Sequence, residues 1–101
     1  MTTHRDRYPI AIGTLLWPQQ TDWADLAAAA RLVDEVGLDS LWTWDHLHAI
    51  VGDPLQPIYE GWATLAGWAA QTERVKLGLM VGANTFRNPG LTAKTAVTVD
   101  H

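Results

Sequence analysis

Cysteine is absent from the 101-residue chain, which excludes a disulfide scaffold, thiolate chemistry and any zinc site built on cysteine. Long hydrophobic runs are missing as well, and no stretch approaches the ~18 apolar residues that cross a bilayer. The 7 Lys and Arg residues are scattered and outnumbered by 11 acidic ones, giving a net charge of −4. A nucleic acid or an anionic membrane would require a basic cluster, so neither is expected as a partner. The polar N-terminus has no apolar segment behind it, which indicates a cytoplasmic protein.

Strand-length apolar runs alternate with segments of helical spacing along the chain. Charged residues make up 18% and hydrophobic residues 48% of the sequence, a balance that favours a folded core over disorder. Apolar runs bounded by charge, Gly or Pro predict buried strands, whereas apolar residues three or four positions apart predict helices. The predicted strands are 9–16, 40–44 and 75–81, and the predicted helices are 21–36, 58–71 and a third that begins at 89.

Three local signals set the ends of the predicted helices. Thr21 or Asp22 can accept hydrogen bonds from the first free N–H groups of the first helix. Gly37 is suited to the left-handed residue that ends it. Asn88 followed by Pro89 is typical of a helix start, with Asn as the cap and Pro at the first helical position.

Alternation of strand and helix predicts parallel strands joined by right-handed crossovers. The strands begin near 10, 40 and 75, close to the ~31 residues per unit of a (β/α)8 barrel of about 250 residues. A dinucleotide-binding half-domain is the alternative, but the segment 15–20 lacks a Gly-x-Gly-x-x-Gly turn. Three parallel strands cannot close a barrel. We therefore expect residues 1–101 to be the N-terminal, incomplete part of a single barrel domain.

A polar cluster follows the second predicted strand, where Asp45 and His46 combine a carboxylate with a general acid–base side chain. The carboxyl end of a barrel strand is the usual place for an active site. The simpler interpretation is that Asp45 caps a turn and His46 is a loop residue. His46 and His48 could also form a metal pair, but two ligands are too few, and His4 and His101 lie away from the predicted strand ends.

Two further segments carry ambiguous signals. The glycines of segment 78–84 indicate either close approach of a flat ligand or tight packing within a buried sheet. Arg87, next to a helix start, would either bind an anion or lie on the surface beside the cap.

The six Trp residues cannot all line one surface, because they fall on different strands and helices. Most are expected in the core. Trp17 and Trp44, at strand ends, are the two that could border a pocket and stack on a planar ring.

Four blocks of the sequence are similar, in order and spacing, to a known family. The chain resembles the N-terminal part of the bacterial luciferase-like monooxygenase family, particularly the branch that uses the deazaflavin coenzyme F420. The blocks are GLDSLWTWDHL at 37–47, YEGWATLA at 59–66, TERVKLG at 72–78 and TFRNPGLTAK at 85–94. Each block is weak alone, but together they extend the resemblance over residues 10–101.

The resemblance implies an α/β fold in which parallel (β/α) units form the first three of a luciferase-like (β/α)8 TIM barrel. It implies hydride transfer between coenzyme F420 and an organic substrate, with Asp45 contacting the coenzyme and His46 as the proton donor. Asp45 could also orient the His46 ring. The family's ring-backing bulge, with a cis peptide bond, corresponds to Met80 and Val81. Ala83 replaces a coenzyme-contacting Thr, which leaves at most a backbone contact there.

Three alternatives remain open from the sequence. One is an FMN-dependent monooxygenase of the same family, and the second is a catalytically inactive fragment that self-associates through exposed strand edges. The third is a metal-dependent hydrolase that uses His46 and His48. The family pattern continues after a pair such as Asp100–His101 with a Gly-rich fourth strand, so we expect this chain alone to be inactive. For the enzyme we expect a small-molecule substrate, no resident metal and a homo-oligomeric state.

Overall fold

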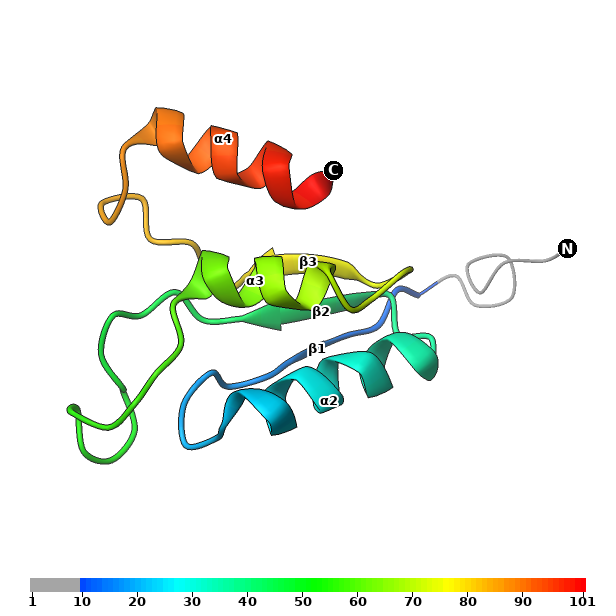
Figure 1. Cartoon of the computed structure of the whole chain (residues 1–101), viewed down its shortest axis with the longest axis horizontal. Helices are drawn as coiled ribbons and strands as arrows, with labels where there is room; N and C mark the ends of the chain where they lie inside the picture. The colour runs from blue at the N-terminus through cyan, green and yellow to red at the C-terminus, as the bar shows by residue number, and fades with distance from the viewer. Residues whose placement is uncertain (1–9) are drawn as a thin grey trace, which may run out of the picture.

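A three-stranded parallel sheet with helices packed on it forms the described part of the chain, residues 10–101 of the computed structural model (Figure 1). The sheet order is β1-β2-β3, with Thr14 opposite Leu41 and Leu41 opposite Leu77. The alternating strand and helix order predicted from the sequence is confirmed. The elements are β1 Gly13–Leu15, α2 Trp23–Glu35, β2 Ser40–Thr43, α3 Gly61–Ala69, β3 Lys76–Leu79 and α4 Pro89–Asp100.

The helix ends follow the signals in the sequence. Asp22 is the cap of α2, since its side chain accepts a hydrogen bond from the N–H of Asp25 at 2.9 Å. Gly37 follows the last turn of α2 with a φ of +83°, a left-handed conformation that favours glycine. Asn88 caps α4 by accepting from the N–H of Gly90, and Pro89 is its first residue. The predictions for these positions are confirmed.

The start of α3 was predicted three residues too early. The helix begins at Gly61 because the carboxylate of Glu60 accepts from the N–H groups of Trp62, at 3.2 Å, and Ala63, at 2.6 Å. Ile58 instead forms an isolated antiparallel bridge with Gln19. The apolar residues before Glu60 have helical spacing, but a cap with extended backbone decides where the helix begins.

The core lies between the sheet and the helices α2 and α3. Alternate residues of β2, Leu41 and Thr43, are fully buried on the helix side. Trp68 of α3 is also fully buried among them. The residues of this cluster are Leu26, Ala30, Val33, Leu41, Leu65, Trp68 and Val75. By contrast, α4 contributes no buried residue and lies apart from the sheet, above α3 and β3 in Figure 1.

Trp42 points to the opposite face of the sheet and lies across Gly78 of the neighbouring strand. A Cβ atom on Gly78 would fall 2.5 Å from Cζ3 of the Trp42 ring, too close for any side chain. The Trp42 indole N–H donates to Oγ of Ser40 at 2.9 Å, which fixes the ring. Of the two interpretations of Gly78, the structure supports tight packing within the sheet.

Asp34, near the end of α2, joins this helix to the start of β3. Its buried carboxylate accepts hydrogen bonds of 2.9 Å from the N–H groups of Glu73, Arg74 and Val75. Burial alone would raise the pKa of the Asp34 carboxyl, but these three hydrogen bonds and the Arg74 charge outweigh it and lower that pKa. The ionised carboxylate of Asp34 therefore holds the backbone N–H groups of the segment that leads into β3.

Both outer strands have one paired side within residues 10–101, because β1 and β3 each pair with β2 alone.

No helix in this part of the chain combines the length and the apolar character that a membrane span requires.

Candidate functional site

The carboxyl ends of β2 and β3 lie side by side and bring two predicted site segments together. The N–H of Met80 donates to the carbonyl of Thr43 at 2.9 Å, so the sheet register continues to the point where both strands end. Asp45 and His46 follow β2, and Val81 follows β3 at the same edge. Two segments that the sequence analysis considers separately therefore lie at one edge of the sheet.

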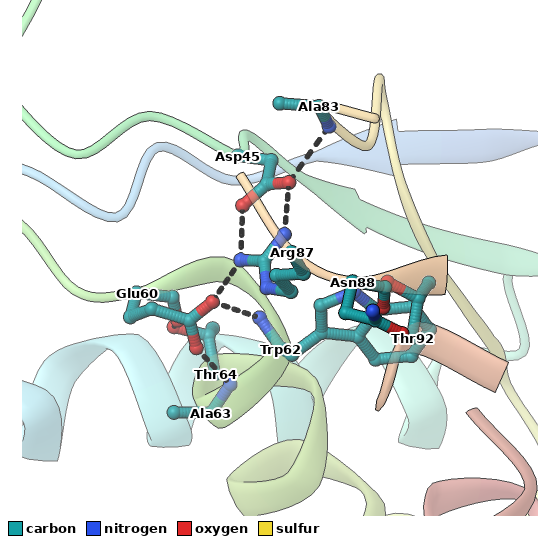
Figure 2. A network of polar contacts seen from close by, with 9 residues as sticks. All are labelled: Asp45, Glu60, Trp62, Ala63, Thr64, Ala83, Arg87, Asn88 and Thr92. Carbon is teal, nitrogen blue, oxygen red and sulfur yellow. Dashed lines mark hydrogen bonds and ion pairs between the residues drawn. The ribbon is translucent and has the colours of Figure 1, made fainter. Parts of the chain in front are cut away.

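Asp45 is the centre of a hydrogen-bond network that joins four segments (Figure 2). It is 3% exposed, and its Oδ2 accepts from the N–H of Ala83 at 2.8 Å and from Nη1 of Arg87 at 2.7 Å. Its Oδ1 accepts from Nη2 of Arg87, also at 2.7 Å. The guanidinium makes a second ion pair with Glu60, the cap of α3.

Arg87 is not the surface residue that one interpretation predicts, and the anions that its guanidinium binds are two carboxylates of this chain. Arg87 neither faces solvent nor presents a free guanidinium to an anion, because its side chain is 14% exposed and held between two carboxylates. It lies 42 residues from Asp45 in the chain, and no local pattern signals that pairing. The signal that the sequence did offer for this pairing was one cation, Arg87, and two carboxylates, Asp45 and Glu60, all near predicted strand or helix ends.

Hydrogen bonding favours the ionised forms of Asp45 and Arg87. The hydrogen bonds from Arg87 lower the pKa of the Asp45 carboxyl, and they outweigh the opposing effect of burial with help from the Ala83 N–H. In turn, the hydrogen bonds with Asp45 and Glu60 raise the pKa of Arg87 above its already high value. One fixed cation therefore sits between two carboxylates.

Gly61, the first residue of α3, leaves room for the Asp45 carboxylate. A Cβ atom at Gly61 would lie 2.9 Å from Oδ1 of Asp45 and 3.1 Å from the carbonyl oxygen of Trp44. The start of α3 can approach the end of β2 this closely because residue 61 has no side chain.

His46 packs against Trp44 rather than against Asp45. The two ring centroids are 5.7 Å apart at an interplanar angle of 80°, an edge-to-face contact. The Asp45 carboxylate binds Arg87 and Ala83 instead, so the prediction that it orients the His46 ring is wrong. The imidazole is half-buried.

Trp17, at the end of β1, lies next to Trp44, with ring centroids 4.9 Å apart. Trp44 is 8% exposed and Trp17 is 49% exposed. The structure thus brings together the two Trp residues expected at a pocket border, and only Trp17 presents much of its ring to solvent.

Met80 and Val81 are joined by a cis peptide bond, as the resemblance implies. Both side chains are exposed, Met80 at 51% and Val81 at 77%, at the end of β3. The N–H of Ala83, two residues later, is engaged by Asp45. The structure shows where these residues lie, and their part in binding remains a prediction.

A cleft of about 1050 Å³ lies between β3, α3 and α4. Leu77, Leu79 and Val99 line it, and Ala83 and Arg87 form its end near the network. His46 does not contribute to the lining, so this cleft and the predicted proton donor lie in different places.

Within residues 10–101, no group of three or more His, Asp or Glu side chains is arranged to hold a metal ion. His48, the suggested second ligand, is exposed. His4, weighed as a further ligand, lies outside the described residues.

Comparisons with known proteins give a family and a structural relative. A family model described as luciferase-like monooxygenase matches residues 8–101. Among solved structures, the chain is similar to one described as an F420-dependent secondary alcohol dehydrogenase in complex with an F420–acetone adduct, with a TM-score of 0.74 and 27% identity. The match covers 84% of this chain and 26% of that protein, so the chain spans about a quarter of its relative's length. No curated protein matches the chain.

Proposed function

The chain belongs to the luciferase-like monooxygenase family, and on that premise we propose that its site serves hydride transfer between coenzyme F420 and an organic substrate. The three parallel strands and their helices match part of a luciferase-like TIM barrel, which confirms the predicted fold class. The F420-dependent relative, 27% identical over 84% of this chain, is the observation that carries the choice of coenzyme. We further propose that residues 1–101 are the first three units of a longer barrel domain.

The residues at the carboxyl ends of β2 and β3 fit the planar ring of such a coenzyme. Met80 and Val81 offer exposed apolar groups at the end of β3, and His46 lies at the end of β2. The charge of Asp45 is already paired with Arg87, so a ring at this edge would not face an uncompensated buried carboxylate. When bound, the coenzyme supplies the hydride donor or acceptor.

In the proposed mechanism, each residue of this chain has a distinct part. His46 holds the proton that moves to or from the substrate oxygen, since an imidazole is the commonest general acid–base group. Its edge contact with Trp44 restrains the ring. Met80 and Val81 support one side of the coenzyme ring. The N–H of Ala83 is bonded to Asp45, so the backbone contact expected at Ala83 cannot come from this N–H.

Asp45 is proposed to contact the coenzyme through its main chain. Its carboxylate already accepts three hydrogen bonds, two from Arg87 and one from Ala83. The side chain therefore fixes the end of β2, and the main chain next to His46 is what it can present to a ligand.

A coenzyme titration of the full-length protein tests this proposal. We expect F420 to bind, with hydride transfer to a carbonyl or from an alcohol substrate. The variant His46→Asn should keep coenzyme binding and lose about 100-fold or more in kcat, because general acid–base catalysis contributes about 10²–10⁴-fold. His48→Asn, two residues away on an exposed loop, is the matched control and should retain wild-type kcat.

The family description favours a second candidate, an FMN-dependent monooxygenase. The same titration separates the two, because tight FMN binding without F420 binding would establish the second candidate and overturn the first.

The unpaired outer sides of β1 and β3 within the described range also suit self-association. Light scattering of the 101-residue chain tests that possibility, and a monodisperse monomer would contradict it.

A further inference from the structure

Building on the proposed function, we propose that Arg87 is a positioning residue that holds the proton donor His46 in place relative to the turn formed by Met80–Ala83. It does so through Asp45, which precedes His46 directly and bonds to Ala83. Neither Arg87 nor Asp45 needs to touch the reacting atoms for this role.

The contacts of the guanidinium support this role. Two parallel hydrogen bonds of 2.7 Å hold Asp45 at the end of β2, and a further contact holds Glu60 at the start of α3. Arg87 itself precedes Asn88, the cap of α4. One side chain thus joins the end of β2 to the starts of two helices, as Figure 2 shows.

The Asp45 carboxylate extends this connection to β3. Its Oδ2 accepts at once from Arg87 and from the N–H of Ala83, so the same oxygen holds both the guanidinium and the turn after β3. In the proposed function the segments on either side of the coenzyme ring are the end of β2 and this turn. Their separation is therefore set by the Arg87–Asp45–Ala83 chain of hydrogen bonds.

Lysine cannot replace this arginine in the network. An ammonium group is a point donor and cannot make the parallel fork to Asp45 while also contacting Glu60. Arg87→Lys therefore keeps the charge and removes the geometry. The change separates an electrostatic role from a positioning role.

The test compares Arg87→Lys with Arg74→Lys in the full-length protein. Arg74 lies just before β3, at the opposite end of the strand, and its side chain bonds to the carbonyl of Asp34 at 3.0 Å. We expect Arg87→Lys to lower kcat about 100-fold with a nearly unchanged Kd for F420, because small displacements of catalytic groups cost about that much. Arg74→Lys should retain wild-type kcat. Added guanidinium ion should partly restore kcat to Arg87→Ala.

A second readout needs no coenzyme. In Arg87→Lys, amide hydrogen exchange at Ala83 should rise while the amides of α2, such as Ala30, stay protected. Wild-type kcat in Arg87→Lys, or a uniform rise in exchange over all amides, would show that Arg87 is merely structural and overturn the inference. If the wild-type protein neither binds F420 nor transfers hydride, the proposed function fails, and the exchange at Ala83 still decides whether Arg87 holds the turn.

Discussion

The packing of Trp42 on Gly78 allows a quantitative prediction for Gly78→Ala. The new Cβ would lie 2.5 Å from Cζ3 and 2.7 Å from Cε3 of the Trp42 ring, and the ring is held by its hydrogen bond to Ser40. Overpacking of this kind costs about 1–3 kcal/mol, whereas replacing a strand glycine by alanine gains about 0.5–1 kcal/mol. We therefore expect the free energy of unfolding to fall by about 1–2 kcal/mol.

Urea unfolding followed by tryptophan fluorescence and circular dichroism measures this loss. Gly82→Ala is the matched control, since its Cβ would meet Leu79 at an ordinary 3.7 Å, and we expect a change within about 0.5 kcal/mol. In a Trp42→Leu background, Gly78→Ala should be neutral or stabilising because the clash is gone. A neutral Gly78→Ala in the wild-type background would refute the argument that Trp42 requires glycine at position 78.

Three further substitutions test other parts of the structure. Gly61→Ala should displace the Asp45 carboxylate, lower stability by about 1–3 kcal/mol and weaken F420 binding, as melting and titration would show. Asp34→Asn should cost about 1–3 kcal/mol at pH 7 because a buried N–H loses its acceptor. Since folding lowers the Asp34 pKa, that difference should persist above about pH 4 and vanish as pH falls through the folded pKa, which urea unfolding at several pH values would reveal. Trp68→Ala should cost about 3–5 kcal/mol, whereas Trp68→Phe should cost clearly less, because it keeps an aromatic ring and removes a buried indole N–H that has no partner among residues 10–101.

Features set by neighbouring residues were predictable from the sequence. The caps Asp22 and Asn88 and the left-handed Gly37 depend on a few adjacent side chains, so their residue types identify them. The alternation of strands and helices likewise follows from hydrophobic spacing. The parallel strands were therefore predictable before any contact was known.

Features that join distant segments were not predictable in the same way. The pairing of Arg87 with Asp45 spans 42 residues, and the correct partner of a charged side chain depends on the fold that brings them together. The partners of Asp45 and His46 were also not predictable. These residues are adjacent in the chain, but Asp45 bonds to Arg87 and His46 packs on Trp44. The cis bond between Met80 and Val81 was predicted from the family resemblance, because composition and spacing do not indicate it.

In the proposed function, an F420 ring is held at the carboxyl ends of β2 and β3. Titrating F420 into the isotope-labelled full-length protein, while following amide chemical shifts, tests this placement of the ring. We expect the largest shifts at His46, Met80, Val81 and Ala83, with little change in α2. Saturable binding whose largest shifts lie elsewhere, or no binding of F420 beside tight binding of FMN, would contradict it.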